Sequence, residues 1–590
     1  ISECLVGSEM CIRDSSMTVS LNASLHQWLS TAWASVYAVP FPSFAWSACP
    51  RLEWGHLTHA GAQQAARALR QSPQAVAQAW VAALPPHPLV EEVSVVGPGH
   101  VNLRLSKAGL DAVVQQGATV FAPAEVPAPT LIEFVSANPT GPLHLGHARQ
   151  AVLGDVLARL VRSLGGQVAT EFFYNDAGVQ IDWLETSVGL RVQELQGTQL
   201  LFERDGATAD QVGPGQALFP AAAYHGDYVI EVAKAWAGEQ GLRAFAIQSL
   251  QADQKADLEA MGISFDFYTS EKSLHESGEV AQVIQALRPH AYQALQPNQA
   301  LDPAPAGAEL AWFLETSKWG DDKDRVMVKA DGSVTYFVPD VAYHLNKWKR
   351  GWERAINIQG ADHHGTLARV QAGVQAVDPS IGPGYPQVIF HTMIKVMKDG
   401  QPVKASKRAG GYITAGEVIA LIGADAFRLS MLEKKPDAQM VLDVDQWLAE
   451  SDRNPAYGLQ VANARLGKAI ERATSESAGE QEVPGWTDVE QTALVELALL
   501  PTRLQAAAVE LDPVKAASVG KAFAETVNRL YFTGPKLLSL NAPSRQARVE
   551  LYAACLQGLL SVSQTLGVSL PKWVEPAPMA GVNSKRPRPS

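Results

Sequence analysis

The stretch of residues 131–166 restricts the fold more than any other part of the chain. It reads LIEFVSANPTGPLHLGHARQAVLGDVLARLVRSLGG and begins with a short apolar run, residues 131–135, that predicts a buried strand. Two prolines and a glycine then predict a tight turn. From Leu145 onward, apolar residues recur at helical spacing until a pair of glycines, which is typical of a helix end. A strand, a turn and a helix in this order predict one unit of an α/β nucleotide-binding sheet.

The turn brings His144, Gly146 and His147 to the first turn of that helix. Free backbone N–H groups and the positive end of the helix dipole favour a phosphate at this place. Gly146 has no Cβ, so a base or a ribose could lie against its backbone. Two imidazoles three residues apart can both donate hydrogen bonds to phosphate oxygens and so stabilise a transferring phosphate. An isolated HxGH can equally be a helix start that happens to contain two histidines.

The residues around this turn carry a family resemblance. HLGH at residues 144–147 resembles the HIGH signature of class I aminoacyl-tRNA synthetases, and SANPTGPLHLGHARQAVLGD is similar to the form found in arginyl-tRNA synthetases. The nicotinamide fingerprint GxGxxG is absent from the turn. The resemblance implies an α/β class I Rossmann-type catalytic domain, an N-terminal α+β domain and a C-terminal all-α helical bundle. It also implies an arginine–tRNA ligase, which activates arginine with ATP to arginyl-adenylate and transfers it to the 3′ end of tRNA(Arg) in protein synthesis.

A second charged element, VKASKRAGG, lies far downstream and would pass for a surface turn if it stood alone. Together with HLGH it resembles the KMSKS loop of the same family in its KxSKR form, at residues 404–408, with Ala405 in place of the usual Met. The resemblance implies that positioning and charge neutralisation supply most of the rate. The catalytic residues that it implies are His144, Gly146, His147, Lys404 and Lys407. The implied ATP-binding residues are Pro139, Thr140, His144, Gly146, His147, Gly360, Asp362, His363, Ser406 and Lys407.

An arginine substrate requires carboxylates, because a carboxylate accepts the planar guanidinium fork through two hydrogen bonds. Residues 334–343, VTYFVPDVAY, predict a strand leading into a helix, where Tyr336 and Asp340 could face one pocket. We expect Asp340 to be the guanidinium partner. Glu133 is the second choice, although a Glu inside an apolar strand could instead bind backbone or a tRNA end. The arginine-binding residues implied by the resemblance are Glu133, Ser136, Asn138, His147, Tyr336 and Asp340.

The sequence GADHHG at residues 360–365 contains two histidines beside an aspartate, which could bind a metal ion. Adjacent residues point to different sides, however, and no further ligands are evident. We therefore expect no metal held by the protein, and the cofactors implied by the resemblance are ATP as a substrate and Mg²⁺.

The chain of 590 residues is longer than a single hydrophobic core usually covers. Residues 1–16 fit neither a helix nor a targeting pattern, and we expect them to precede a native start at Met17. Residues 17–121 predict an α+β unit, with helices at 61–70 and 73–84 and a strand pair at 92–96 and 100–105. This unit resembles the tRNA-contacting N-terminal domain of bacterial arginyl-tRNA synthetases, most clearly in VVGPGHVNLRLS; a purely structural module is the alternative.

We expect the catalytic domain at residues 129–450, with an insertion at about 190–310. Residues 451–574 show helical periodicity, predict a bundle and resemble the anticodon-binding domain of the family, and the Pro-rich basic residues 575–590 predict disorder. The net charge of −12 gives no global signature of nucleic-acid binding, so RNA contact must use local patches. Tyr457, Arg465 and Asn528 are the candidates for tRNA contact within the bundle.

The sequence has no apolar run of 18 residues, and its four cysteines lack CxxC spacing. These features favour a cytoplasmic protein without a membrane partner, and we expect a monomer that binds tRNA(Arg), L-arginine and ATP. Two alternative functions are a class I synthetase for another amino acid and a tRNA-binding paralogue without catalysis. The first would be favoured by loss of Tyr336 and Asp340, and the second by loss of either signature.

Overall fold

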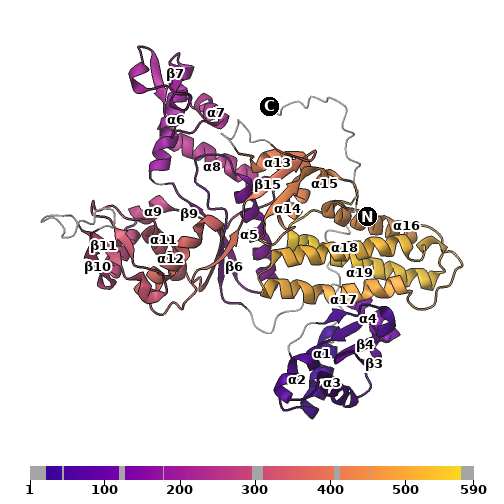
Figure 1. Ribbon diagram of the computed structural model, residues 1–590. Coiled ribbons are helices and arrows are strands. Elements are labelled where there is room, and N and C mark those ends of the chain that lie inside the picture. The colour runs from indigo at the N-terminus through magenta and orange to yellow at the C-terminus, as the bar shows by residue number, and fades with distance from the viewer. Residues whose placement is uncertain are drawn as a thin grey trace.

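The computed structural model describes residues 21–42, 46–117, 127–176, 178–295, 310–403, 412–451 and 453–572 (Figure 1). Three predicted features lie outside the described residues: the leader at 1–16, the loop at 404–408 and the tail at 575–590. Overall, a central parallel sheet is joined to a long helical bundle, against which a small N-terminal unit packs.

The central sheet has five parallel strands in the order β14-β13-β5-β6-β9. These strands are β5 (Thr130–Glu133), β6 (Val168–Tyr174), β9 (Phe267–Ser270), β13 (Arg354–Gly360) and β14 (Gln387–His391). From β5 the chain builds outward to β6 and β9, and then returns to the other side of β5 for β13 and β14. The strand order therefore reverses between β5 and β13, which is where open α/β sheets bind ligands. This sheet confirms the predicted α/β class.

The stretch of residues 131–166 folds as a strand, a turn and a helix, as predicted, but its strand ends earlier than expected. β5 ends at Glu133 because the next turn begins at once: Val135 and Ser136 have φ angles of +74° and +41°. Helix α5 (Leu145–Ser163) follows and is buried along most of its length. The helix ends just before Gly165, which has a φ of +77°.

The connections around the sheet carry most of the remaining elements of this part of the chain. Between β6 and β9 lie α6 (Val179–Leu195), β7 (Gln199–Phe202), β8 (Gln216–Phe219), α7 (Asp227–Ala235) and α8 (Leu242–Ala260). Of these, α6, α7 and β7 form a lobe that projects from the sheet (Figure 1). Between β9 and β14 lie α9 (Glu271–Glu276), α10 (Glu279–Leu287), the antiparallel strands β10 (Ala291–Ala294), β11 (Ala311–Leu314) and β12 (Arg325–Val328), α11 (Phe337–Lys349) and α12 (His364–Val377).

The strand predicted within residues 334–343 is wrong. Val334 makes only an isolated bridge to Val328, and Tyr336 already has helical φ and ψ angles before α11 begins. Of the β-branched residues of this segment, Val338 and Val341 lie within α11, because tertiary packing overrides their weak strand preference.

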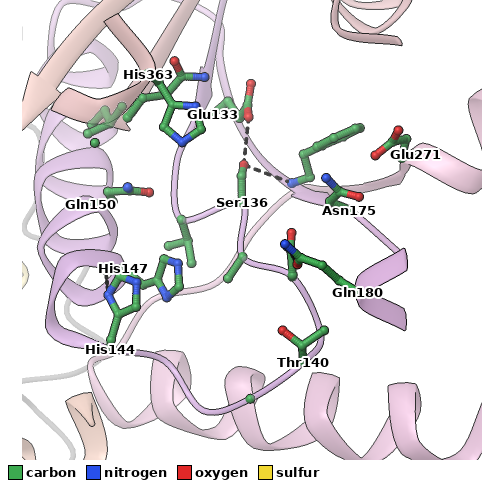
Figure 2. A pocket seen from close by; sticks show the side chains of 18 of the residues that line it. Glu133, Ser136, Thr140, His144, His147, Gln150, Asn175, Gln180, Glu271 and His363 are labelled. Carbon is green, nitrogen blue, oxygen red and sulfur yellow. Dashed lines mark hydrogen bonds between the residues drawn. The ribbon is translucent and has the colours of Figure 1, made fainter. Parts of the chain in front are cut away.

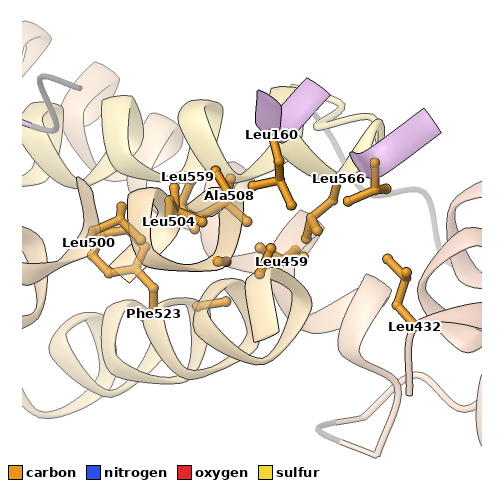
Figure 3. Close-up of a cluster of buried hydrophobic side chains, with 14 of the residues drawn as sticks. Leu160, Leu432, Leu459, Leu500, Leu504, Ala508, Phe523, Leu559 and Leu566 are labelled. Atoms are coloured by element: carbon orange, nitrogen blue, oxygen red, sulfur yellow. The ribbon is translucent and has the colours of Figure 1, made fainter. Parts of the chain in front are cut away.

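A small second sheet leads from the parallel sheet into the bundle. It consists of β15 (Ile394–Lys398), β16 (Gln401–Pro402) and β17 (Met440–Asp443), with helices α13 (Ala415–Ile422), α14 (Ala424–Met431) and α15 (Val444–Leu448) beside it. The bundle itself contains α16 (Pro455–Ser475), α17 (Asp488–Val509), α18 (Pro513–Thr533) and α19 (Ala542–Leu566), in agreement with the helical periodicity of residues 451–574. Leu160 of α5 packs into the same buried cluster as Leu459 and Leu566, so the sheet and the bundle share one core (Figure 3).

Helix α17 is long and apolar enough, by length and composition alone, to be a candidate membrane span. Of its most apolar 18-residue window, 61% is buried inside the protein. Its apolar residues, such as Leu500 and Leu504, belong to the bundle core in Figure 3. Its hydrophobicity is therefore accounted for by packing.

The N-terminal unit combines a four-stranded antiparallel sheet with four helices. The strand order is β1-β2-β4-β3, with β1 (Ser47–Ala48), β2 (Leu57–His59), β3 (Val90–Val96) and β4 (His100–Leu105). The predicted helices are confirmed as α2 (Gly61–Leu69) and α3 (Pro73–Ala82), and the Ser72 hydroxyl accepts a hydrogen bond from the Ala75 amide, 3.2 Å away, as an N-cap. Helices α1 (Leu21–Val36) and α4 (Lys107–Gln116) complete the unit.

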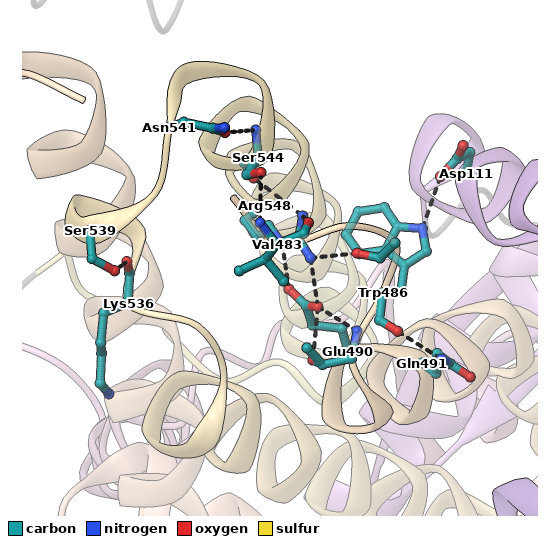
Figure 4. A network of polar contacts seen from close by, with 12 residues as sticks. Asp111, Val483, Trp486, Glu490, Gln491, Lys536, Ser539, Asn541, Ser544 and Arg548 are labelled. Carbon is teal, nitrogen blue, oxygen red and sulfur yellow. Dashed lines mark hydrogen bonds and ion pairs between the residues drawn. The ribbon is translucent and has the colours of Figure 1, made fainter. Parts of the chain in front are cut away.

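Polar contacts fix this unit to the bundle (Figure 4). The indole of Trp486 donates a hydrogen bond to Asp111 of α4 at 2.8 Å, and its ring lies 5.1 Å from the guanidinium of Arg548. Arg548 is buried and pairs with Glu490 through contacts of 2.8 and 3.1 Å. A charged pair within the bundle thereby supports the residue that binds the N-terminal unit.

Candidate active site

A cavity of about 620 Å³ opens at the carboxyl ends of β5, β6 and β13, beside the first turn of α5 (Figure 2). It lies at the point where the strand order reverses. The walls come from segments far apart in the sequence, including α9 and α11. The predicted site residues that line it are Glu133, Ser136, Asn138, Thr140, His144, His147, Tyr336, Asp340, Gly360 and His363.

The remaining predicted residues lie elsewhere. Pro139 and Gly146 belong to the same turn but do not line the cavity. The side chain of Asp362 is 83% exposed and lies 3.6 Å from His363 in a surface contact. Lys404, Ser406 and Lys407 fall outside the described residues.

His144 and His147 form a stacked pair. The Nδ1 atom of His144 accepts a hydrogen bond from the backbone amide of His147 at 3.2 Å, which makes His144 the N-cap of α5. The ring centroids are 3.6 Å apart and the planes are inclined by 15°. Burial lowers the pKa of His144 and holds that of His147 well below its usual value, where His144 and His391 lower it further. At neutral pH both rings are therefore uncharged, and because Nδ1 of His144 accepts, its Nε2–H is left to donate.

Two further features of this turn involve His147 and Gly146. Nδ1 of His147 is buried and has no hydrogen-bond partner among the described residues. Such an atom is costly unless a ligand or water pairs with it. A Cβ on Gly146 would lie 2.8 Å from Cε1 of His144 and 2.9 Å from its Nδ1. Gly146 is therefore needed for the capping position of the His144 ring, a role that the sequence did not suggest.

The loop before the histidines is held through its backbone carbonyls by side chains from three other segments. Each donor binds the carbonyl of a different part of the loop, so together they fix the position of the loop beside the cavity. None of the three donors was predicted from the sequence, since nothing local links them to the loop. They are Gln254, whose Nε2 lies 2.9 Å from the carbonyls of Asn138 and of Gly141, Tyr228, whose hydroxyl lies 2.7 Å from the carbonyl of Thr140, and Tyr412, whose hydroxyl lies 2.9 Å from the carbonyl of Pro142.

Three carboxylates line the opposite wall: Glu133, Glu271 and Asp340. Glu133 is not free, because its Oε2 pairs with the ammonium of Lys347 at 2.6 Å and its Oε1 accepts from the Ser136 hydroxyl at 2.8 Å. The Asp340 carboxylate makes no side-chain hydrogen bond to the described part of the chain. Burial and the neighbouring Glu133 and Glu271 raise the pKa of Asp340 to about 7. A cation that enters the cavity would stabilise the ionised form of this carboxyl group.

Tyr336 and Asp340 line the same cavity from the start of α11, as their spacing predicted. Tyr336 is 88% exposed and stands at the rim, whereas Asp340 is half-buried one turn further along the helix. The two histidines of GADHHG differ in their surroundings. His363 lines the cavity, while the ring of His364 stacks on Phe390 with centroids 3.6 Å apart.

The three tRNA candidates meet at a second cavity, of about 340 Å³, on the bundle. Arg465 donates to Oδ1 of Asn528 at 3.0 Å, and Nδ2 of Asn528 donates to the carbonyl of Gly458 at 3.0 Å. The guanidinium of Arg465 lies 4.4 Å from the ring centroid of Phe532, a residue that is 56% exposed. Phe532 was not predicted as part of this group, because only the fold brings it beside Arg465; an exposed aromatic ring beside an arginine can stack on a base.

Comparisons with known proteins agree with this architecture. The model of the arginyl tRNA synthetase N terminal domain matches residues 24–105. An arginine–tRNA ligase of Methylibium petroleiphilum is 38% identical over 553 residues, which cover 88% of this chain and 93% of the relative. That of Thiobacillus denitrificans is 38% identical over 545 residues, covering 88% and 92%. The solved Thermus thermophilus arginyl-tRNA synthetase, at 19% identity, shares the fold with a TM-score of 0.68 over 93% of this chain and 99% of that chain.

Proposed function

Since the chain belongs to the arginine–tRNA ligases, a family of class I aminoacyl-tRNA synthetases, we propose that the 620 Å³ cavity is where it activates arginine. The overall reaction of the enzyme has two steps. The arginine carboxylate attacks the α-phosphate of ATP and releases pyrophosphate, and a terminal ribose hydroxyl of tRNA(Arg) then takes the arginyl group and releases AMP. The observation that carries the proposal is the meeting of a histidine-capped helix start and an acidic wall across one cavity.

The acidic wall suits the two cationic groups of arginine. Asp340 is the guanidinium partner, because its carboxylate has no partner of its own in the described chain and its raised pKa reflects uncompensated negative surroundings. Glu133 is already paired with Lys347, so its part is to complete the wall together with Ser136. Asn138 and Tyr336 contact the substrate from the turn and the rim, and His147 lies where arginine and ATP would meet.

The histidine side suits the triphosphate. Neutral His144 and His147 donate hydrogen bonds to phosphate oxygens as negative charge shifts toward the leaving pyrophosphate. Thr140, Gly360 and His363 line the same space and complete the ATP site, with Pro139, Gly146 and Asp362 as supporting residues. No acid or base is required, since the attacking carboxylate is already ionised and the leaving group is a stable anion.

Lys404 and Lys407 add positive charge to this side, and Ser406 adds a hydroxyl. Support comes from Tyr412, which follows their segment, lines the cavity and donates to the carbonyl of Pro142. His144 and Thr414 also form a backbone bridge. The described chain that follows these residues therefore begins directly beside the histidine turn.

Mg²⁺ accompanies ATP in this proposal and neutralises phosphate charge. Among the residues that the structure describes, no group of three or more His, Cys, Asp or Glu side chains could hold a metal ion. This fits an ion carried mainly by the substrate phosphates, as is usual for Mg²⁺. Arginine-dependent exchange that persists after Mg²⁺ is removed by a chelator would contradict this part.

Consecutive parts of the chain have different roles in this proposal. Residues 17–121 contact tRNA, residues 129–450 catalyse, and residues 451–574 bind the anticodon through the cavity of Tyr457, Arg465 and Asn528. The enzyme works as a cytoplasmic monomer without a membrane partner. One chain supplies the walls of both cavities, and a monomer of 63.3 kDa in light scattering is the expected result.

The decisive experiment is ATP–pyrophosphate exchange with each amino acid, with and without tRNA. Exchange with arginine alone among the amino acids is expected. Exchange with another amino acid would reassign the substrate. The absence of ATP–pyrophosphate exchange with every amino acid, in the presence of tRNA that can be charged, would leave only an RNA-binding role.

A further inference from the structure

Lys347 is a buried cation that no sequence motif assigned. It lies on α11 with a side chain that is 0% exposed, directly behind Glu133 and two turns from Asp340. Its ammonium does not line the cavity. A lysine in such a place is rare unless it is fully paired.

All three donors of this ammonium are engaged by the protein. They point to Glu133 Oε2 at 2.6 Å, to Asn357 Oδ1 at 3.1 Å and to the face of the Tyr343 ring, whose centroid is 4.2 Å away. No donor is left for a substrate. Lys347 therefore acts only through its neighbours.

Those neighbours connect both carboxylates of the arginine wall. Asn357 donates from Nδ2 to Nε2 of His344 at 2.8 Å, and Nδ1–H of His344 donates to the backbone carbonyl of Asp340 at 2.7 Å. On the other side, Glu133 accepts from Ser136 at 2.8 Å, which holds the turn whose φ angles are positive. One continuous network thus runs from Ser136 through Glu133, Lys347, Asn357 and His344 to the backbone of Asp340.

Stability alone does not explain this arrangement. Well-packed apolar side chains of similar volume often stabilise a protein as much as, or more than, a buried ion pair. The pair does change the charge of the cavity. When all three are ionised, Glu133, Glu271 and Asp340 carry three negative charges, and Lys347 cancels one of them. The charge that remains matches the guanidinium and the α-ammonium of one arginine.

From this geometry we propose that Lys347 is a positioning residue for arginine: it neutralises Glu133, holds the Glu133 carboxylate on Ser136 and leaves Asp340 and Glu271 to receive the substrate's cations. The inference rests on the proposed arginine site in the 620 Å³ cavity. Lys347 also affects the pKa of Asp340, which is faced by Glu133 of β5, Glu271 of α9 and Lys347 of α11. Because Lys347 lowers the pKa of Asp340 while both glutamates raise it, loss of Lys347 moves that pKa upward.

The test is a charge cycle of three variants: Lys347→Met, Glu133→Gln and the double variant. Each single change leaves one buried charge uncompensated, so each should raise the KM for arginine about tenfold or more in ATP–pyrophosphate exchange, with the KM for ATP within about twofold of wild type. The double variant restores neutrality and should recover most of the arginine KM. In Lys347→Met the rise of kcat/KM for arginine with increasing pH should also be displaced to a higher pH, because the pKa of Asp340 is raised.

Lys349→Met is the matched control, because it removes the same charge from the same helix at an exposed position. It should change neither KM. If Lys347→Met does not fold, the double variant still decides, since a weak arginine KM there contradicts the charge argument. An unchanged arginine KM in both single variants, or equal losses for arginine and ATP, would overturn the role of Lys347. If Asp340→Asn also left arginine binding unchanged, the site assignment itself would be at fault.

Discussion

The imidazole rings of His144 and His147 are stacked 3.6 Å apart, and the first ring caps the helix that carries the second. Two imidazolium ions could not share this geometry, because like charges at this distance repel strongly with little solvent between them. The pair therefore stays neutral in the folded enzyme. It serves as two directed N–H donors at a helix start that already favours anions.

This arrangement predicts that the free energy of unfolding decreases at acid pH. Burial lowers the folded-state pKa of both histidines, so as pH falls the unfolded chain takes up protons first, from about pH 6.5. The free energy of unfolding should therefore be fully retained above this pH and decrease below it. His147→Gln should reduce that dependence between about pH 6.5 and 5. Urea unfolding at several pH values measures it, and an identical slope in the variant would contradict the prediction.

Gly146→Ala should reduce catalysis because the new methyl group would displace the ring of His144. The added Cβ would lie 2.8 Å from that ring, which real Cβ contacts essentially never show. We expect kcat for arginine-dependent exchange to fall by about 100-fold, comparable to the loss of one preorganised donor. Gly467→Ala is the control, since a Cβ at that helical position meets nothing within 4 Å. Equal activity in both variants would show that the His144 ring position does not matter.

The stretch at residues 131–166 could be predicted because strand, turn and helix signals are local in sequence. The same holds for the helical periodicity of residues 451–574 and for the helices at 61–70 and 73–84. Asp340 and Tyr336 could be paired because four residues make one helical turn. In each case the informative residues lie within a few positions of one another.

The remaining parts of the site depend on contacts that no local pattern encodes. Glu133 and Lys347 are 214 residues apart, and only the pairing of β5 with β13, together with α11, brings them together. For the same reason Gln254 and Tyr412 could not be linked to the loop that they hold. Asp362 was placed with its neighbours as one motif, yet the turn into α12 directs its side chain to solvent, while His363 lines the cavity.

Asp340 should give arginine use a pH dependence with a midpoint near neutrality. Its pKa is raised to about 7, so below that pH the group is protonated and no longer attracts the guanidinium. We expect kcat/KM for arginine to rise with pH through about 7 in the wild-type enzyme. Asp340→Asn should lower kcat/KM by a factor that corresponds to about 2–5 kcal/mol and remove this limb.

Asp331→Asn is the matched control for Asp340, because Asp331 is an exposed residue shortly before the same helix. It should retain both the magnitude and the pH profile of arginine activation. A pH limb that persists in Asp340→Asn would assign the titration to Glu271 instead, whose pKa burial also raises.

Arg465 offers a test of the bundle cavity. Arg465→Met removes the contact to Asn528 and the cation over Phe532, so we expect kcat/KM for tRNA to fall about 10- to 100-fold, in line with about 1–3 kcal/mol for one stacked base. The KM for arginine at saturating tRNA should stay unchanged. Arg529→Met, an exposed arginine of α18 outside this cavity, is the control. Equal losses of tRNA use in the two variants would reduce the effect to general charge.

Glu490 should be essential for stability, because it compensates a buried arginine at the junction with the N-terminal unit (Figure 4). Glu490→Gln leaves Arg548 buried without its counter-charge and should lower the free energy of unfolding by about 3 kcal/mol or more. Glu496→Gln, on the same helix, breaks a partly exposed pair with Arg503 and should cost about 1 kcal/mol or less. Urea unfolding of both variants measures the difference. Arg548 supports Trp486, which binds Asp111, so limited proteolysis should release the N-terminal unit earlier from Glu490→Gln than from the wild-type protein. Equal free energies of unfolding for Glu490→Gln and Glu496→Gln would contradict this prediction.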